Sequence, residues 1–555
     1  MNNKYKLDCG CEFDIFDTIV KQNDGLPSIG IDFTNVRMDC PLAWDIFSLG
    51  RTKGVFQLEN KLGQDWSASI KPLDLDELSA VISVIRPGTL KSKLNGKSLT
   101  RLFSDRKNGL ETVEFIHPAL APILSKTYGI LVYQEQAMKI ATDLAGFNLQ
   151  EADTLRKAIG KKNAELMTKV EKEFISKSKT FGVINEDITN TIFGWIRESQ
   201  KYSFNKSHGV AYGKIGYLCA YAKAHFPIHF FTSSLFYAKD KQYPQEEIEA
   251  LIEDAMIDGI NVCPPTLKHF GKGVDVAHFY SYDKNIYFGV SDVSGIGDSA
   301  SKKLKVKLEE VEKEIGKVIT SWSWYEFLIH FCDGITSTTV QNLIDVGGLD
   351  FIDLTRSRER KKFEYNLYKS LDSKEKSYIK FIDANNLGEA LLKIVSDPLL
   401  KRSENRKNNL TMLANQYSNS PYSTKDSMHT IIVAEEKLLG VPVSITRINT
   451  CLTRGTNTCN EIQYRKDKSK ITLACEIINV REHLIKNANS KAYGKTMAFV
   501  KVKDDTGTFD GVCVFADEYE NFSNLLYKSN TVLLKGAISE KNDAKSFIVK
   551  EVEQI

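Results

Sequence analysis

The sequence predicts a multidomain α+β protein that is mainly helical and ends in an all-β OB-fold barrel. The chain has 555 residues, which is too long for one hydrophobic core and indicates three or four domains. Apolar residues recur at helical spacing from Trp66 to Tyr237. From Ile471 onward, five short runs alternate apolar and polar residues between turn residues, which is typical of an OB-fold barrel.

The composition narrows the function class without naming one. Hydrophobic residues make up 42% and charged residues 26% of the chain, as in an ordinary soluble protein. The formal net charge of +3 is nearly neutral, so nucleic-acid binding has to come from local basic patches. Because no apolar run is long enough to span a membrane, we expect no membrane contact. The cytoplasmic location that we expect is based on the cysteines described next.

Ten cysteines are scattered along the chain without the spacing of a disulfide framework, which favours a reducing compartment. Cys9 and Cys11 form a C-x-C, whereas Cys451 and Cys459 lie farther apart. Since neither pair has the usual spacing of a zinc site, the sequence does not predict a metal role for cysteine.

Residues 26–37, LPSIGIDFTNVR, alternate apolar and polar residues around Gly30 and Asp32, as in a strand with one polar side. Hard divalent cations take carboxylate and phosphate oxygens. A carboxylate on such a strand can therefore hold Mg²⁺.

A basic, aromatic and hydroxyl-rich segment, QKYSFNKSH at residues 200–208, precedes a helical apolar run that Pro227 interrupts; we call it the 200–208 loop. The loop ends with Asn205, Lys206, Ser207 and His208. The apolar residues of the run are Val210, Ile215, Leu218 and Ala222. A helix beginning here would direct N–H groups, a cation and a hydroxyl to one place, which suits a phosphate. The alternative is an ordinary N-cap before a buried helix, with Lys206 solvated.

A second basic segment follows the pattern of a helix over residues 151–160. The pattern turns Leu155 and Ile159 inward. The outward cations and those just beyond the helix are Arg156, Lys157, Lys161 and Lys162. Such a basic face is usually only solvated, and the alternative is that it binds an anion.

Residues 287–304, YFGVSDVSGIGDSASKKL, carry the signature of a helix-hairpin-helix. Gly295 and Gly297 let the backbone approach a DNA phosphate. The cations on the following helix are Lys302 and Lys303, which add attraction independent of sequence. Residues 338–350, TTVQNLIDVGGLD, predict a second, degenerate copy. A structural hairpin without DNA is the alternative.

Residues 403–427 are polar and predict a linker or a surface loop. The expected barrel carries aromatic and basic residues that suit a single strand of nucleic acid, although each is equally expected as a plain barrel residue. These residues are Tyr493, Phe499, Lys501 and Phe515.

Five segments in order resemble the fingers of the bacterial DNA polymerase III alpha subunit, a family C replicative polymerase. They are GVFQLEN (54–60), IRPGTL (85–90), YGILVYQEQAMKIA (128–141), ADTLRKAIGKK (152–162) and FNKSH (204–208). The resemblance runs from about residue 27 to the C-terminus and is strongest over residues 54–237. It implies an end or remnant of the palm at 1–60, fingers at 61–285, a helix-hairpin-helix region at 286–371, a linker and extension at 372–434, and an OB-fold domain at 435–555.

Asp32 resembles the third catalytic aspartate of the palm, which implies a catalytic role and a Mg²⁺ ligand. In a second alignment, residues 27–33 match the D-x-D palm strand itself, with Gly30 in place of the first acid. Asp74 and Asp76 also form a D-x-D, but their context predicts a helix start with Asp74 as the N-cap. Two-metal phosphoryl transfer needs carboxylates on both ions. No D-x-D palm strand precedes Asp32, so the sequence supplies one of the family's three aspartates. Either a second polypeptide supplies the other two, or the chemistry is lost.

The resemblance also implies roles for the cations. Arg156 and Lys157 stand where an arginine pair contacts the incoming triphosphate, and the lysine keeps the charge but loses the bidentate fork. The implied nucleotide-binding residues are Arg156, Lys157, Asn205, Lys206, Ser207 and His208. The implied DNA-binding residues are Arg86, Lys161, Lys162, Gly295, Gly297, Lys302 and Lys303. A structural salt bridge is the alternative for Arg86. Gln134, Glu135 and Gln136 are expected either to make polar contacts near the nascent base pair or to serve helix packing.

These features predict DNA-templated DNA synthesis, that is, nucleotidyl transfer to a primer 3′ end, by a chain that needs a separate palm-bearing partner. The first alternative is a non-catalytic DNA-binding accessory protein derived from a polymerase. Further alternatives are a single-strand-binding OB protein with an unrelated helical domain and a helical protein without nucleic acid. Expected partners are primer–template DNA, deoxynucleoside triphosphates and the second polypeptide, with Mg²⁺ shared with ligands outside this chain. A sliding clamp is a candidate partner, but the sequence has no clear clamp-binding peptide. The resemblance implies that the expected cytoplasm is that of a bacterial cell or a phage-infected host.

Overall fold

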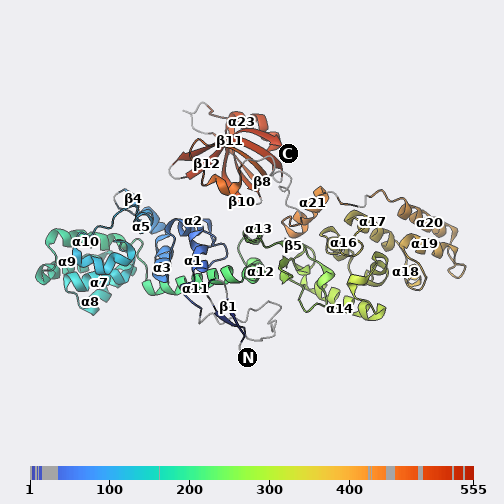
Figure 1. Ribbon diagram of the computed structural model, residues 1–555, viewed down its shortest axis with the longest axis horizontal. Helices are drawn as coiled ribbons and strands as arrows, with labels where there is room; N and C mark the ends of the chain where they lie inside the picture. The colour runs from blue at the N-terminus through green and yellow to red at the C-terminus, as the bar shows by residue number, and fades with distance from the viewer. Residues whose placement is uncertain are drawn as a thin grey trace. The chain divides into compact units, whose positions relative to one another are not determined.

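The computed structural model describes residues 3–6, 9, 12–15, 36–94, 96–161, 163–422, 425–426, 428–444, 457–485, 492–504, 506–527, 530–541 and 544–555. The chain forms two compact units, with the division between Ser234 and Leu235. Helices dominate, and a closed five-stranded barrel ends the second unit (Figure 1). The predicted fold class is therefore confirmed. No helix in the described ranges is both long and apolar enough to cross a lipid bilayer.

The first unit begins with an antiparallel hairpin of β1 (Asn3–Lys6) and β2 (Glu12–Ile15). Its first helical core surrounds α3 (Leu75–Val84), which is buried over most of its length. Asp74 caps α3, as predicted, because its carboxylate accepts the backbone N–H of Glu77 at 2.8 Å. The neighbouring elements in the chain are α1 (Pro41–Ser48), α2 (Lys61–Ile70), α4 (Pro87–Lys91), β3 (Lys93–Leu94), β4 (Lys97–Ser98) and α5 (Leu99–Lys107). Residues of α1, α2 and α5 belong to the same core, as do Tyr217, Ala220 and Tyr221 farther along the chain.

A second core of the first unit gathers the next helices (Figure 1). They are α6 (Ala121–Leu124), α7 (Gln134–Ala145), α8 (Leu149–Gly160), α9 (Ala164–Phe181) and α10 (Glu186–Ser199). Asparagine side chains cap the first turns of α8, α9 and α10. Leu155 and Ile159 of α8 point into this core, as the sequence predicts.

Helix α11 (Lys206–His225) buries a different face from the one that its aliphatic residues suggest. Ile215 is 45% exposed. The buried residues are Gly209, Gly213, Gly216, Tyr217, Ala220, Tyr221 and Lys223. Close approach of α3 explains the glycine at 209, because a Cβ there would lie 2.6 Å from the Ser79 hydroxyl. Pro227 opens α12 (Pro227–Ala238) and so ends the run, as predicted.

The second unit continues from α12 with helices and a small sheet in the order β5 (Val262–Cys263), β7 (Asn285–Tyr287) and β6 (Tyr280–Tyr282). Its helices before the barrel are α13 (Pro244–Ile257), α14 (Asp298–Ile315), α15 (Trp324–Glu326), a π-helical turn at Phe327–Phe331, α16 (Ser337–Asp345), α17 (Arg358–Lys369), α18 (Ser373–Ile379), α19 (Leu387–Ser396), α20 (Glu404–Ser418), α21 (Met428–Leu439) and α22 (Cys459–Ile462).

Helix α20 corrects the prediction of a linker or loop over residues 403–427. The Ser403 hydroxyl caps it by accepting the backbone N–H of Arg406 at 3.3 Å. Its buried residues are Leu410, Leu413, Ala414 and Tyr417. These residues recur at three- and four-residue spacing, so one side of α20 packs on α19. The many polar residues between them hid this periodicity.

The barrel has the strand order β10-β12-β11-β8-β9. Its strands are β8 (Lys470–Leu484), β9 (Thr496–Asp504), β10 (Gly507–Val514), β11 (Thr531–Lys541) and β12 (Ala544–Gln554). β10 and β12 pair in parallel, the other neighbours pair antiparallel, and α23 (Ala516–Phe522) lies between β10 and β11 in the chain. This arrangement confirms the predicted OB-like barrel.

Candidate nucleotide and DNA interface

The 200–208 loop contacts three of the other four motif segments in the first unit. The IRPGTL segment presses against it, since a Cβ at Gly88 would lie 2.6 Å from the Lys201 carbonyl oxygen. The 128–141 segment pairs with it in a short bridge: the N–H of Phe204 donates to Val132 O at 3.0 Å, and the N–H of Gln134 donates to Phe204 O at 2.9 Å. Residues distant in sequence therefore meet at this loop.

Helix α8 ends against the same loop. The Gln200 side chain donates to the carbonyl oxygen of Ala158 at 3.2 Å. A Cβ at Gly160 would lie 3.5 Å from Gln134 Nε2. The last turn of the basic helix is thus fixed beside the segment that begins α11.

The GVFQLEN segment packs along α11 instead. The rings of Phe56 and Tyr212 lie 5.0 Å apart. Lys223, which is buried, donates to the carbonyl oxygens of Arg51 at 2.7 Å and Lys53 at 3.1 Å. Because an ammonium needs such partners when buried, these contacts fasten the turn before GVFQLEN to α11.

The N-terminus of α11 already holds a carboxylate. Glu135 Oε2 accepts the backbone N–H of Lys206 at 3.0 Å, and Glu135 Oε1 accepts from Asn205 Nδ2 at 2.8 Å. Asn205 also caps the helix through His208 N at 2.9 Å. A negative group is favoured at this end of a helix. Here the negative group is the carboxylate of Glu135, at the position where the sequence suggests a phosphate. The residue pattern of α7 does not indicate that the Glu135 side chain reaches α11.

The other side chains at this helix start face neighbouring elements. Lys206 Nζ lies 3.4 Å from Asp76 Oδ1. The His208 ring lies 3.9 Å from the Tyr212 ring. Ser207 occupies the second position of the helix and is exposed.

Arg156 and Lys157 share one carboxylate on the outward face of α8. Arg156 Nη2 lies 2.9 Å from Asp153 Oδ1, and Lys157 Nζ lies 2.8 Å from Asp153 Oδ2. Hydrogen bonds from Lys157 and then Arg156 hold the pKa of Asp153 below its usual value. A bound phosphate would compete with Asp153 for both cations. Lys161 is exposed at the end of α8, and Lys162 lies outside the described residues.

The side chains of Arg86 and Gln136 make contacts within the first unit. The Arg86 guanidinium lies 3.7 Å from the centre of the Phe204 ring, and burial lowers its pKa. Gln136 is buried and accepts the N–H groups of Val132 and Tyr133, each at 2.9 Å. Of the two expectations for Gln136, helix packing is the one observed.

The predicted Mg²⁺ ligand Asp32 lies outside the described residues. Within the described ranges, the one group of three or more His, Cys, Asp and Glu side chains close enough to share a metal ion is Cys9, Cys40 and His225. It contains no carboxylate and so does not suit Mg²⁺.

The helix-hairpin-helix signature folds as a tight turn before α14. Gly295 has a φ of +83°, which requires glycine, and Ile296 is buried. Gly297 is the N-cap of α14, and a Cβ there would meet nothing within 4 Å. Lys302 and Lys303 are exposed on α14. The backbone at Gly297 is therefore open to an approaching phosphate.

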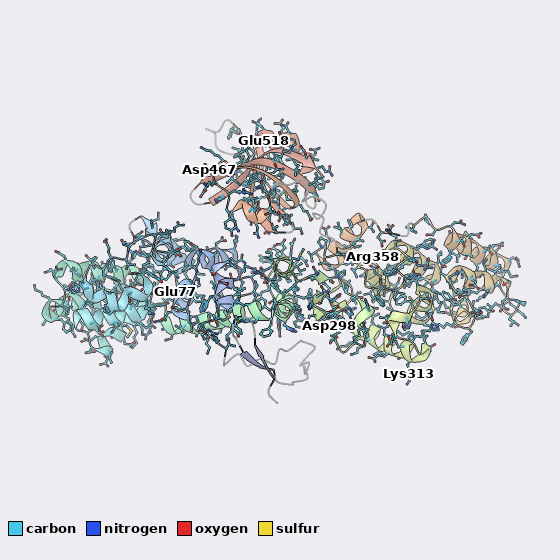
Figure 2. All side chains as sticks on the ribbon, viewed as in Figure 1. Glu77, Asp298, Lys313, Arg358, Asp467 and Glu518 are labelled. Atoms are coloured by element: carbon cyan, nitrogen blue, oxygen red, sulfur yellow. The ribbon has the colours of Figure 1, made fainter. Side chains whose placement is uncertain are left out.

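His278 contacts an aspartate on each side of this turn in the chain. Its Nδ1 lies 3.3 Å from Asp292 Oδ1, and its Nε2 lies 3.3 Å from Asp298 Oδ1. Asp298 is the first residue of α14 (Figure 2). The hydrogen bond to Asp292 raises the pKa of His278.

The second copy of the hairpin lies earlier than predicted. Gly334, with a φ of +91°, precedes Ile335 and Thr336, and Thr336 caps α16. This run matches the first turn residue by residue, so the hairpin precedes residues 338–350 instead of lying within them. Threonine in place of the second glycine hid the copy. Asn342 of α16 donates to the carbonyl oxygen of Ser294 at 2.8 Å and joins the two copies.

A groove of about 600 Å³ lies between the second turn and α14. Its lining residues include Lys302, Lys303, Lys307, Gly334 and Ile335. Glu310 also lines the groove, so the three lysines give it a net positive charge. Nucleic-acid binding by a nearly neutral chain needs a local basic patch of this kind.

The barrel candidates lie on its outer surface. Phe499 pairs across the strands with Arg481, whose guanidinium lies 5.2 Å from the ring centre. Lys501 is half-buried two residues along β9, while Tyr493 and Phe515 are exposed. A stacked aromatic beside cations can bind a nucleobase.

Comparison with known proteins finds similarity to bacterial DNA polymerase III alpha subunits. Residues 13–182 match the model of the bacterial DNA polymerase III alpha subunit finger domain. The chain is 29% identical over 551 residues to the DNA polymerase III subunit alpha of Aquifex aeolicus, covering 98% of this chain and 41% of that protein. It is 36% identical over 300 residues to the Thermus aquaticus subunit, covering 53% and 23%. It is 26% identical over 549 residues to the Staphylococcus aureus subunit, covering 97% and 44%. The chain spans less than half the length of these relatives.

Proposed function

Because this chain is related along nearly its whole length to the DNA polymerase III alpha subunit, as a counterpart of its C-terminal part, we propose that it takes part in DNA-templated DNA synthesis. The reaction is nucleotidyl transfer to a primer 3′ end, with pyrophosphate leaving. The observation that carries the proposal is the 200–208 loop, against which α8, the 128–141 segment and the IRPGTL segment all pack.

In this function the first unit binds the incoming nucleotide. Arg156 and Lys157 exchange the carboxylate of Asp153 for triphosphate oxygens, while Lys206 adds a third cation from the start of α11. One exposed ion pair contributes only about 0–1 kcal/mol, so a multiply charged anion needs several cations together. Asn205, Ser207 and His208 line the same helix start.

The metal chemistry is shared with groups outside this chain. Asp32 is the proposed ligand from this chain, and a separate palm-bearing polypeptide supplies the other carboxylates. Mg²⁺ would stabilise charge on the attacking and leaving oxygens. The chain's own described residues position the triphosphate through α8 and the helix start of α11.

The helix-hairpin-helix region binds the DNA backbone. Gly295 shapes the turn, Gly297 leaves room for a phosphate, and Lys302, Lys303 and Lys307 line the adjoining groove. Arg86, Lys161 and Lys162 are proposed DNA contacts at the fingers, with Arg86 acting through its stack on Phe204. The proposed location is the cytoplasm, where the substrates are.

Photocrosslinking tests the nucleotide site directly. The purified chain, with primer–template DNA and an azido-deoxynucleoside triphosphate, is irradiated, and the labelled peptides are mapped. We expect labelling on α8 and the start of α11, and its loss with excess unmodified nucleotide. Labelling confined to other segments would contradict the proposed pocket.

A non-catalytic DNA-binding accessory protein is the second candidate. Glu135 at α11 and Asp153 at α8 already satisfy the groups expected to hold the triphosphate. This candidate predicts DNA binding with no nucleotide-dependent crosslink, whether or not a palm-bearing polypeptide is present.

A further inference from the structure

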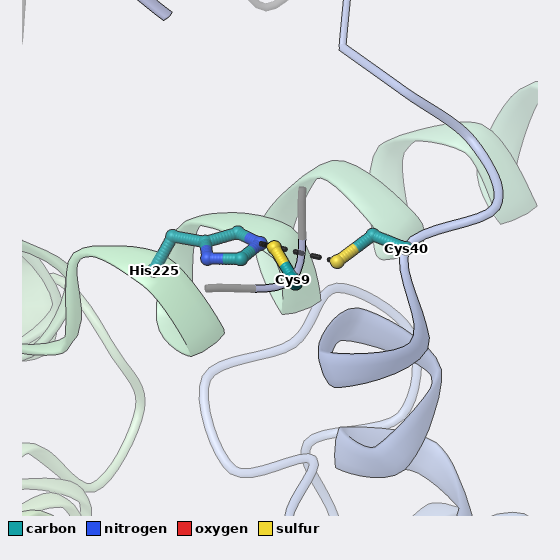
Figure 3. Close-up of side chains that lie close together, drawn as sticks. All are labelled: Cys9, Cys40 and His225. Atoms are coloured by element: carbon teal, nitrogen blue, oxygen red, sulfur yellow. Dashed lines mark hydrogen bonds between the residues drawn. The ribbon is translucent and has the colours of Figure 1, made fainter. Parts of the chain in front are cut away.

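Three potential metal ligands meet near the N-terminus of the first unit. Cys40 Sγ lies 3.2 Å and Cys9 Sγ lies 3.9 Å from the same atom, His225 Nε2. All three ligand atoms lie within 4.8 Å of one another. Figure 3 shows both sulfur atoms at the Nε2 edge of the His225 ring.

These separations are close to those of a tetrahedral zinc site. Zinc binds thiolate at about 2.3 Å and imidazole at about 2.0–2.1 Å. Tetrahedral angles then place sulfur about 3.5 Å from nitrogen. The two measured distances, 3.2 Å and 3.9 Å, lie on either side of this value.

The surrounding structure holds each ligand in place. Cys40 is fully buried and is the N-cap of α1, where the helix end favours a thiolate. The Tyr217 hydroxyl accepts the N–H of Cys40 at 3.1 Å and donates to Arg37 O at 2.8 Å. The His225 ring lies 4.4 Å from the ring of Tyr221. Such outer contacts orient metal ligands.

We propose that Cys9, Cys40 and His225 bind one zinc ion that has a structural role. Zinc suits two thiolates and an imidazole better than the oxygen-seeking Mg²⁺ does. Three protein ligands leave one tetrahedral position for water or another group. The ion connects the turn between β1 and β2, where Cys9 lies, to the start of α1 and the end of α11.

The sequence does not suggest this site because its ligands come from three separate segments. His225 follows Cys40 by 185 residues and Cys9 by 216 residues. Only the folding of α11 against α1 brings them together. The site is separate from the proposed nucleotide pocket, so either proposal can fail alone.

Metal analysis of the full chain tests the proposal. The chain is purified under reducing conditions without chelator, and its zinc content is measured by mass spectrometry after acid digestion. We expect about one zinc per chain, and an X-ray absorption spectrum at the zinc edge that requires sulfur and nitrogen neighbours.

Paired variants locate the ion. Cys40→Ser and His225→Asn should each lose most of the zinc. Cys219→Ser and His229→Asn, which change a half-buried cysteine of α11 and a histidine of α12 outside the cluster, should keep it. Circular dichroism shows that each variant is folded.

Two results would overturn the proposal. One is a folded wild-type chain that holds no zinc after incubation with equimolar zinc. A Cys9–Cys40 disulfide found by mass spectrometry in such a chain counts as the same result. The other is a zinc content that Cys40→Ser and His225→Asn leave unchanged. If the variants do not fold, the absorption spectrum of the wild type decides, because oxygen neighbours alone exclude these ligands.

Discussion

The carboxylate of Glu135 occupies the N-terminus of α11. It joins Asn205 and the N–H of Lys206, so it both stabilises the helix and occupies the position of an anion. Asp153 does the same for the cations of α8. The proposed nucleotide site is therefore held in shape by two internal carboxylates that a triphosphate has to displace.

Glu135→Ala should destabilise the first unit. It leaves Asn205 Nδ2 and the N–H of Lys206 without their acceptor, and a donor left unsatisfied costs about 1–3 kcal/mol. Urea unfolding followed by tryptophan fluorescence measures the change. Lys172→Ala, on the exposed side of α9, is the matched control and should have little effect. Equal stability of the Glu135 variant and the control would show that this cap is not important.

Arg156→Ala should weaken nucleotide use much more than DNA binding. Loss of a charge-assisted contact of about 1.5–3 kcal/mol implies a rise in the nucleotide KM of about ten- to hundred-fold in the assembled enzyme. Asp153→Asn is the opposite probe, because it releases Arg156 and Lys157 and should lower KM. Steady-state kinetics and a separate DNA-binding titration distinguish the two effects. A fall in DNA affinity with unchanged KM would make α8 a DNA-backbone contact.

Helix α11, which begins within the 200–208 loop, packs closely against α3. Their contact uses Gly209 and Gly213 in place of larger side chains, and Ser79 fills the space opposite. Overpacking a close contact of this kind costs about 1–3 kcal/mol. The glycines of α11 thus have a packing role that no hydrophobic pattern reveals.

Gly209→Ala should lower the free energy of unfolding, because the new Cβ would lie 2.6 Å from Oγ of the buried Ser79. This overpacking costs about 1–3 kcal/mol and outweighs the gain of about 1 kcal/mol in helix propensity. Gly194→Ala in α10 is the control, since nothing lies within 4 Å of its Cβ position and alanine favours a helix by about 1 kcal/mol. The two variants should therefore shift thermal unfolding in opposite directions. Shifts of the same sign would disprove the close contact of α3 and α11.

The hairpin before α14 gives a test of DNA binding. Gly297→Val fills a position that is open in the folded chain, so it should weaken duplex binding uniformly across sequences without unfolding the protein. Fluorescence anisotropy at several salt concentrations measures affinity and its steep salt dependence. Gly297→Ser, which keeps a good helix cap, controls for the loss of helix stability and should weaken binding less. Unchanged affinity in a folded Gly297→Val variant would indicate a purely structural hairpin.

Local pattern predicted much of the architecture but not its long-range contacts. The cap at Asp74, the inward face of α8 and the barrel strands follow from residue spacing. Helix α20 was missed because polar residues hide its apolar side, and the second hairpin was displaced because Thr336 replaces a glycine. The pairing of Glu135 with α11 depends on tertiary folding, which spacing within one segment does not encode.

The whole chain combines a fingers-like unit with a second unit that carries two hairpins and an OB-like barrel. Each unit carries one of the two proposed binding surfaces: cations and a helix start in the first, and a lysine-lined groove in the second. The relatives are more than twice as long as the matched part. A division of labour in which another polypeptide brings the remaining palm carboxylates is our proposal, and primer extension tests it.

Primer extension tests this account most directly. The purified chain is assayed with primer–template DNA, the four deoxynucleoside triphosphates and Mg²⁺, alone and in the assembly that co-purifies with it. The account predicts little or no extension by the chain alone, and extension by the assembly that Arg156→Ala slows at low nucleotide concentration. Robust extension by the chain alone, or an assembly that binds DNA but never extends a primer, would contradict it.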